Sequence, residues 1–321
     1  MIKVIQSPRI GIFATPKQKP TAMITRLEEI VEEARRRGPK RLAVAYGQDS
    51  HTLEAVDRAC AEGIVIPLIY GDKQIIEDTC REAGIDSSRF TIIDEPNDVQ
   101  CVRKAVSDVA SGRADVLMKG LVSTEKYMRG ILDKEIGLLP PKGLLSHVSV
   151  VQLPNYPRLL VVGDVAVIPL PDFKQKTQLI RYLVKTANSL GIEQPRLACI
   201  APSEQLLPSV VSSTEGAILA KMGDRGQLGK VTVDGPLSLD VALYPEVAKE
   251  KKVTGSSVAG QADCLLFPNI ESGNVFFKSA THFCGAEIAA MVVGTKAPCV
   301  LTSRGDTPST KLYSIALACI S

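Results

Sequence analysis

The sequence predicts an α/β protein in which a mostly parallel sheet is covered by helices on both faces. Short apolar runs alternate with amphipathic stretches of ten or more residues, and this alternation is typical of successive βαβ units. The chain has 321 residues, more than one hydrophobic core usually serves, so we expect two domains. A Pro/Gly-rich joint at residues 137–143 interrupts the alternation and marks the expected passage from one domain to the other.

The first half of the chain is predicted to contain an opening helix at residues 23–34, followed by four strand–helix units. The strands are expected at residues 41–46, 64–70, 90–94 and 114–118. Asp49, Asp72 and Asn97 are good N-cap residues, and they mark where the helices after the first three strands begin.

The second half begins with a predicted antiparallel hairpin. Strands at residues 144–152 and 158–162 flank the turn sequence Pro154-Asn155-Tyr156-Pro157. Alternation with helices then resumes, with strands expected at residues 196–201, 230–233, 264–267, 290–293 and 299–301. A last helix should start at Pro308, because Thr307 is a good N-cap and proline is favoured at the first helical position.

The turn after the last strand carries a hydroxyl, a guanidinium and a carboxylate, on Ser303, Arg304 and Asp306. Such a turn, at the C-terminal end of a strand and just before a helix, is where α/β proteins bind ligands. The helix N-terminus favours an anion, and the arginine fork fits phosphate oxygens in pairs. The pattern indicates a site for phosphate or an acyl phosphate. The alternative is a solvated loop in which Arg304 pairs with Asp306.

A second turn of this kind follows the strand at residues 114–118, with Lys119, Gly120, Ser123 and Thr124 at the start of a helix. Its spacing is not that of a Walker loop. N-capping by Ser123 or Thr124 is the alternative explanation for the hydroxyls. Because capping gives Lys119 no role, the turn favours a ligand.

Composition argues against several classes of function. The net charge of +3 is too small to predict a nucleic-acid or membrane partner, and no apolar run approaches the roughly 20 residues that span a bilayer. The 3 histidines lie far apart and the 8 cysteines are scattered, so no metal site is expected. The N-terminus lacks a signal-peptide core, and we expect a cytoplasmic protein with reduced cysteines.

Several strand-end segments, taken together, resemble the phosphate acetyl/butyryltransferase family, and its butyryltransferase branch most of all. The segments are 114–124, 144–148, 222–227, 233–240, 259–263, 268–275 and 301–306. The resemblance implies two α/β domains of the isopropylmalate-dehydrogenase-like type, with the active site in the cleft between them. Residues 1–139 and 291–321 would form the first domain, and residues 140–290 the second.

The resemblance implies an acyltransferase that moves a short-chain acyl group between CoA and inorganic phosphate, so that butyryl-CoA and phosphate give butyryl phosphate and CoA. CoA and phosphate are substrates, no metal or redox cofactor is implied, and family members are commonly homodimers. No cysteine lies in the two polar turns, so we expect direct attack in a ternary complex.

Other functions stay open at this point. One alternative is a phosphate acetyltransferase acting on acetyl-CoA, and another is a homologue that binds acyl-CoA or phosphate without turnover. A metal-dependent dehydrogenase on the same fold would need clustered aspartates, which the isolated Asp234 and Asp240 do not supply.

Carried over residue by residue, the resemblance assigns catalysis to Ser303 and Arg304, with the arginine binding phosphate and the polarised carbonyl. Phosphate acetyltransferases use an aspartate six residues after this arginine as the base for the CoA thiol, where this chain has Thr310. Asp306 is the nearest carboxylate and the expected catalytic replacement. The asparagine that the family has after the hairpin is Ile168 here. The residues assigned to substrate binding are Lys119, Gly120, Ser123, Thr124, Ser146, Asp234 and Asn274.

Overall fold

The computed structural model of the protein describes residues 22–303 and 305–321, so residues 1–21 and Arg304 lie outside the described part. Its strands are β1 (Lys40–Ala45), β2 (Val65–Gly71), β3 (Thr91–Asp94), β4 (Val116–Lys119), β5 (Ser146–Gln152), β6 (Leu160–Gly163), β7 (Arg196–Ile200), β8 (Thr232–Leu237), β9 (Cys264–Leu266), β10 (Glu287–Val293) and β11 (Cys299–Val300). Its α-helices are α1 (Leu27–Arg37), α2 (Ser50–Ala61), α3 (Lys73–Glu82), α4 (Asp98–Ala110), α5 (Thr124–Ile131), α6 (Phe173–Ser189), α7 (Val211–Asp224), α8 (Leu239–Leu243), α9 (Pro245–Glu250), α10 (Ile270–His282) and α11 (Pro308–Ile320).

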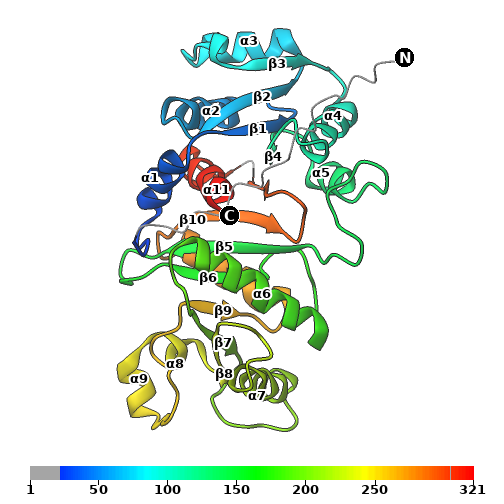
Figure 1. Cartoon of the computed structure of the whole chain (residues 1–321). Coiled ribbons are helices and arrows are strands. Elements are labelled where there is room, and N and C mark those ends of the chain that lie inside the picture. Colours follow the sequence, from blue (N-terminus) through cyan, green and yellow to red (C-terminus); the bar gives the residue numbers. More distant parts are fainter. Residues whose placement is uncertain (1–21, 304) are drawn as a thin grey trace, which may run out of the picture.

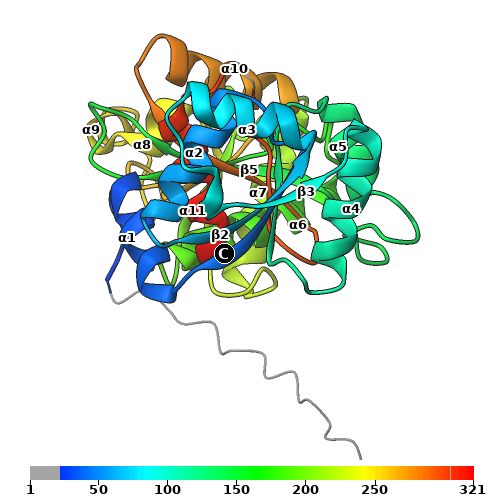
Figure 2. The same ribbon diagram turned by 90° about the horizontal axis from the view of Figure 1, so that it is seen from above.

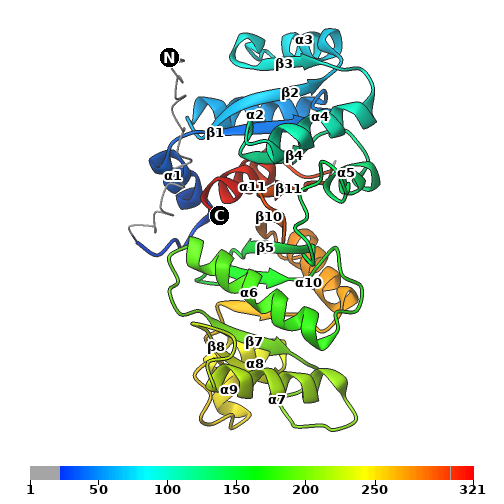
Figure 3. The same ribbon diagram turned by 45° about the vertical axis from the view of Figure 1, so that its right-hand side comes forward.

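The described strands form one mixed sheet in the order β3-β2-β1-β4-β11-β10-β5-β6-β9-β7-β8 (Figure 1). Neighbouring strands from β3 to β11 are parallel, and so are those from β6 to β8. Between these two groups, β10 is antiparallel to both β11 and β5, and β5 is antiparallel to β6. The predicted α/β class is confirmed, with helices on both sides of the sheet (Figures 2 and 3).

The predicted hairpin is the β5–β6 pair, in which Val151 lies opposite Leu160. The largest differences in strand extent from the prediction are at β8 and β10. The sequence placed the end of one strand at Val233, but β8 continues through Pro236, which is tolerated because β8 is the outermost strand of the sheet. β10 starts earlier than predicted, at Glu287, because it pairs with β5 along its whole length.

Helix starts follow the caps that the sequence predicts. The side chains of Asp49, Asp72, Asn97, Ser123 and Thr307 each accept a hydrogen bond from a backbone N–H in the first turn of the helix that follows. Each cap satisfies one of the donors that a helix N-terminus leaves without an intrahelical partner. Local sequence therefore sets the start of α2, α3, α4, α5 and α11.

The last strand and helix of the chain complete the first half of the sheet. β11 lies between β4 and β10, and Cys299 pairs with Leu117 of β4. α11 packs on α1 and α2, and Figure 1 shows it beside these helices from the other end of the sequence. The predicted boundary between residues 290 and 291 falls inside β10, which joins the two halves of the sheet. The division into two domains stays a prediction.

The hydrophobic core consists of three clusters of buried side chains, one on the first face of the sheet and two on the other face. On the first face, α1, α2, α11, α6 and α7 cover strand residues such as Val44 and Met118. On the second face, α4 and α5 cover Leu117 and Val292, whereas α8, α9 and α10 cover a separate cluster around Leu160. Successive residues of a strand, such as Leu117 and Met118, point to opposite faces.

Candidate active site

Two polar turns follow neighbouring parallel strands at the same edge of the sheet. β4 pairs with β11, with Met118 beside Val300, so the turn that begins at Lys119 and the turn at residues 302–306 leave the sheet side by side (Figure 3). The hydroxyl of Tyr127 in α5 donates to the carbonyl oxygen of Val300 at 3.0 Å and ties α5 to the end of β11. The structure thus brings together the two turns that the sequence singled out.

The turn at residues 302–306 is closed by the carboxylate of Asp306. The Ser303 N–H donates to Asp306 Oδ2 at 2.6 Å, and the Asp306 N–H donates to the Ser303 carbonyl oxygen at 3.2 Å. Ser303 is exposed, so its side chain is available to a ligand. Arg304, between these residues in the sequence, lies outside the described residues. Asp306 is thus half-buried and engaged with its own turn.

The ammonium group of Lys311 lies behind this turn. Its Nζ donates to the Ser303 carbonyl oxygen at 3.0 Å and to Thr302 Oγ1 at 3.4 Å. Burial lowers the pKa of Lys311, while the carboxylates of Asp49 and Asp306 act in the opposite direction. The sequence analysis did not single out Lys311. The available signal was a charged residue within a helix that is otherwise largely apolar.

Lys119 supports the second turn in a similar way. Its buried Nζ donates to the carbonyl oxygens of Gly120 and Val122, at 3.0 Å each. Gly120 has a steric role of its own, because an added Cβ would lie 2.3 Å from the carbonyl oxygen of Tyr46. No structural role for Lys119 could be predicted from the sequence, and these contacts supply one.

The two hydroxyls after Lys119 differ in their surroundings. Ser123 is the N-cap of α5, and its Oγ accepts from the Lys126 N–H at 3.3 Å. Thr124 is the first residue of α5 and is exposed. Capping therefore accounts for Ser123, while Thr124 is exposed at the start of the helix.

Ser146 is part of a buried network centred on Asp164. The Ser146 hydroxyl donates to Asp164 Oδ2 at 2.7 Å, and the His147 N–H donates to the same oxygen at 3.1 Å. Oδ1 accepts from the N–H groups of Ala166 and Val167, at 2.7 and 2.8 Å. Asp164 thus organises the segment after β6, and the Ser146 hydroxyl is committed to it.

His147 links this network to the turn at residues 302–306. The imidazole is buried, its Nδ1 lies 3.4 Å from Ser149 Oγ, and no described residue hydrogen-bonds to Nε2. Burial lowers the pKa of His147, while Asp164 and Asp306 act to raise it. His147 is therefore a buried imidazole within electrostatic reach of Asp306. Sequence reasoning considered it only as one of the few potential metal ligands.

The two remaining predicted residues, Asn274 and Asp234, lie in different places. Asn274 Nδ2 donates to the Val165 carbonyl oxygen at 3.1 Å, which places it beside the segment that Asp164 organises. Asp234 lies in β8, whose position in the sheet is six strands from β11. At the usual strand spacing this separation is roughly 30 Å. The structure does not bring Asp234 near the two turns.

Two further observations bear on the type of site. Among residues 22–303 and 305–321, no three or more His, Cys, Asp or Glu side chains are grouped so that they could hold a metal ion. Within the same residues, no helix is long and apolar enough to cross a membrane.

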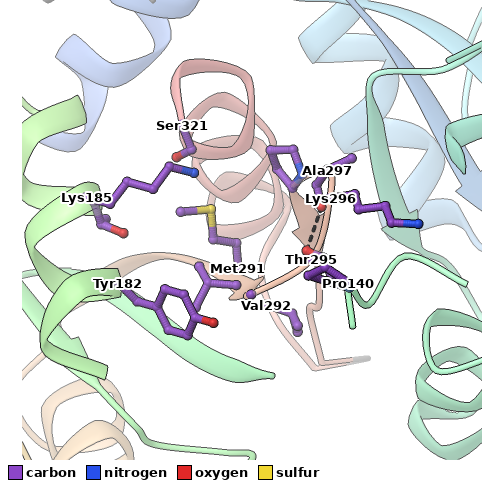
Figure 4. Close-up of a pocket in the computed structure, with 13 residues that line it drawn as sticks. Pro140, Tyr182, Lys185, Met291, Val292, Thr295, Lys296, Ala297 and Ser321 are labelled. Carbon is purple, nitrogen blue, oxygen red and sulfur yellow. Dashed lines mark hydrogen bonds between the residues drawn. The ribbon is translucent and has the colours of Figure 1, made fainter. Parts of the chain in front are cut away.

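A separate cavity of about 430 Å³ is drawn with its lining residues in Figure 4. It is lined by Tyr182 and Lys185 of α6, by residues 291–298 and by Ser321 after α11. The turn at residues 302–306 lies at the opposite end of α11, a helix of 13 residues. A helix of this length extends about 20 Å, so the cavity and the two turns are separate features.

Comparisons with known proteins identify the family. Residues 95–319 match the family described as phosphate acetyl/butaryl transferase. The chain is 43% identical over 298 residues to the phosphate butyryltransferase of Clostridium acetobutylicum, covering 93% of this chain and 98% of the relative. It is 39% identical over 294 residues to the phosphate acetyltransferase of Thermotoga maritima, covering 92% of this chain and 99% of the relative. The chain therefore belongs to the phosphate acetyl/butyryltransferase family.

A solved structure extends the likeness to the fold. The crystal structure of a branched-chain phosphotransacylase from Enterococcus faecalis superposes with a TM-score of 0.76 at 28% identity. The match covers 88% of this chain and 99% of the other. The same arrangement of strands and helices thus extends over nearly the whole of both proteins.

Proposed function

We propose that this protein transfers a short-chain acyl group between CoA and inorganic phosphate, so that butyryl-CoA and phosphate give butyryl phosphate and CoA. The observation that carries the proposal is the pair of polar turns after β4 and β11, in a chain 43% identical to a phosphate butyryltransferase. Each turn opens a helix, and helix N-termini at one edge of the sheet favour an anion such as phosphate.

In this proposal the turn at residues 302–306 holds the reacting groups. Ser303 is exposed. Its hydroxyl group would donate a hydrogen bond to the negative charge that develops on the thioester as phosphate attacks. Arg304 would pair with phosphate oxygens and the acyl carbonyl; this assignment rests on the sequence. A preformed donor aimed at a developing oxyanion stabilises the transition state by about 3–4 kcal/mol.

The proposed step is a direct attack. A phosphate oxygen bonds to the thioester carbonyl carbon, the C–S bond breaks with its electron pair on sulfur, and CoA leaves as a thiolate that takes a proton. No covalent intermediate on the enzyme is required. Cys299, the first residue of β11, is a poor nucleophile because burial raises its pKa to about 12.

In the reverse direction the CoA thiol must lose its proton, and we propose Asp306 as the acceptor. Oδ2 of Asp306 is engaged with the Ser303 N–H, while no described residue hydrogen-bonds to Oδ1. The turn after β4 would bind phosphate or CoA through its backbone and through Ser123 and Thr124. Asn274 would complete the site from the other half of the molecule, whereas the buried Ser146 hydroxyl is committed to Asp164 and gives no support to a direct contact with substrate. The strand order gives Asp234 no support as a substrate-binding residue.

The test of this proposal is phosphate-dependent release of the CoA thiol from a series of donors, from acetyl-CoA to hexanoyl-CoA. We expect a rate that saturates with phosphate, and the highest kcat/KM with butyryl-CoA or another short straight or branched chain. Thiol release that is independent of phosphate would contradict the proposal. An acetyl-CoA optimum would favour the activity named for the Thermotoga maritima relative.

We further propose that residues 1–139 with 291–321 and residues 140–290 are two domains with the active site between them. Support comes from His147 and Asp306, which belong to different proposed domains, because the Asp306 carboxylate acts to raise the pKa of His147. We also propose a cytoplasmic homodimer. Sedimentation velocity of the purified chain tests the dimer.

A further inference from the structure

The ammonium group of Lys311 is buried directly behind the turn that carries Ser303. Lys311 is 3% exposed, and its Nζ donates to the Ser303 carbonyl oxygen at 3.0 Å and to Thr302 Oγ1 at 3.4 Å. The Ser303 carbonyl belongs to the peptide group that joins Ser303 to Arg304. The contact therefore fixes the backbone at the point where the two proposed catalytic residues meet.

This position is unfavourable for a cation in two ways. Burial removes water from the ammonium group, and the desolvation outweighs the opposing effect of Asp49 and Asp306 on its pKa. Lys311 also lies near the N-terminus of α11, where the helix dipole disfavours positive charge. All residues from Leu312 to Ile320 are buried, so an apolar side chain at position 311 would suit the core. A lysine retained against these costs points to a role in the site.

We propose that Lys311 is a positioning residue for acyl transfer, whose charged ammonium group holds the Ser303 carbonyl and so orients Ser303 toward the substrates. This inference rests on the proposed function. Ser303 is exposed to solvent, whereas its carbonyl oxygen accepts a hydrogen bond from the buried Lys311 ammonium group. The side chain is therefore accessible to a ligand while Lys311 holds the backbone of the same residue. Asp306 holds the same residue through its N–H.

Loss of the charge on Lys311 as pH rises is expected to change activity and stability in opposite directions. The charged groups that act on it, among the described residues, are Asp49 before α2 and Asp306 in the turn. Because burial lowers the pKa of Lys311, the unfolded chain binds this proton up to a higher pH than the folded protein does. Between the two pKa values, the contribution of Lys311 to the free energy of unfolding therefore rises with pH. Activity falls over the same range, because a neutral amine holds the carbonyl less firmly than an ammonium group.

The experiment compares the wild type with Lys311→Met, Lys311→Arg and the control Lys176→Met. Lys176 is a matched control because it is also a buried lysine, paired with Glu215 and away from the two turns. The kcat, the KM values for phosphate and acyl-CoA, and the Tm are measured from neutral pH to about pH 10. The assay runs in the direction that consumes acyl-CoA, so that no substrate thiol has to ionise.

We expect Lys311→Met to fold and to lose kcat on the order of 10–100-fold. Lys311→Arg should retain part of the kcat and lose the alkaline fall in activity, because a guanidinium group does not deprotonate in this range. Lys176→Met should keep the wild-type kcat.

Wild-type kcat and pH dependence in Lys311→Met would overturn the inference. A wild-type enzyme whose activity does not fall at alkaline pH would also overturn it, and this measurement requires no variant to fold. If the wild type releases no CoA in the presence of phosphate, the proposed function fails instead.

Discussion

At the scale of residues, Lys119 and Lys311 hold the backbone of the two turns from behind. Both lysines are buried; Lys119 donates to two main-chain carbonyl oxygens of its turn, and Lys311 donates to one carbonyl oxygen and one hydroxyl. Bonds in which the donor carries a charge are stronger than neutral ones, and burial strengthens them further. Each turn therefore has a fixed shape before a substrate arrives.

Replacing Lys119 tests this support in the first turn. We expect Lys119→Met to lower the free energy of unfolding by about 3 kcal/mol, because two buried carbonyl groups lose a charged donor. Urea denaturation measures the loss, and the KM for phosphate is measured in parallel. The control Lys126→Met removes an exposed ion pair with Asp98 and should change stability by less than about 1 kcal/mol. Unchanged stability in Lys119→Met, with a raised KM, would instead make Lys119 a direct substrate ligand.

Asp306→Asn separates two roles for the carboxylate. Asparagine retains an oxygen that can accept from the Ser303 N–H and close the turn, but it is not a base. In the direction that consumes acyl phosphate, we expect a lower kcat at neutral pH. The kcat should partly recover as pH rises toward about 8.5, where a thiol ionises unaided. A pH–rate profile shows which role applies, since an equal loss at every pH would restrict Asp306 to shaping the turn.

The candidate site could be predicted only in part from the sequence. Ser303, Asp306 and Lys119 stand out because a strand end, a polar turn and a helix start are all local signals. The contacts of Lys311 and His147 are not local, since they depend on how α11 and β5 lie against the turn in the folded chain. The hydrogen bond from Ser146 could not be predicted either, because its partner Asp164 lies just after the neighbouring strand β6.

At the scale of elements, strand positions and helix starts follow from nearby residues. The caps at Asp49, Asn97 and Thr307 could be predicted because an N-cap hydrogen bond spans only a few residues. The extents of β8 and β10 could not, because they depend on neighbouring strands. β8 passes through Pro236 only because it is at the edge of the sheet, and β10 is extended by its pairing with β5.

Gly120→Ala tests the contact between the loops that follow β1 and β4. The Leu121 N–H donates to the Tyr46 carbonyl oxygen at 2.8 Å, so the loops after β1 and β4 lie in contact. Because a Cβ at position 120 would lie 2.3 Å from that carbonyl oxygen, Gly120→Ala must shift backbone. We expect a loss of about 1–3 kcal/mol in the free energy of unfolding and a reduced kcat/KM.

Thermal unfolding and steady-state kinetics check this prediction. Gly305→Ala is the control for stability, because its added Cβ would meet no atom of residues 22–303 and 305–321 within 4 Å. Wild-type stability and kcat/KM in Gly120→Ala would show that the two loops can separate without effect on the site.

At the scale of the whole molecule, the order of the strands decides which residues meet. β11 returns from the end of the chain to lie beside β4, and this pairing brings residues 119 and 303 to one edge of the sheet. The same order places β8, with Asp234, at the far end. Neither fact follows from periodicity or turn residues. The resemblance to the family supplied the expectation that the chain returns to its first half, and the sheet shows that it does.

The most direct measurement of the central claim is the phosphorus NMR spectrum of the purified protein incubated with butyryl-CoA and inorganic phosphate. We expect a new acyl phosphate signal that grows in step with the free CoA thiol and disappears when excess CoA is added. Free thiol without an acyl phosphate signal would mean that water, and not phosphate, accepts the acyl group. That result, or a spectrum that does not change, would contradict the assignment of the two turns as a site for acyl transfer to phosphate.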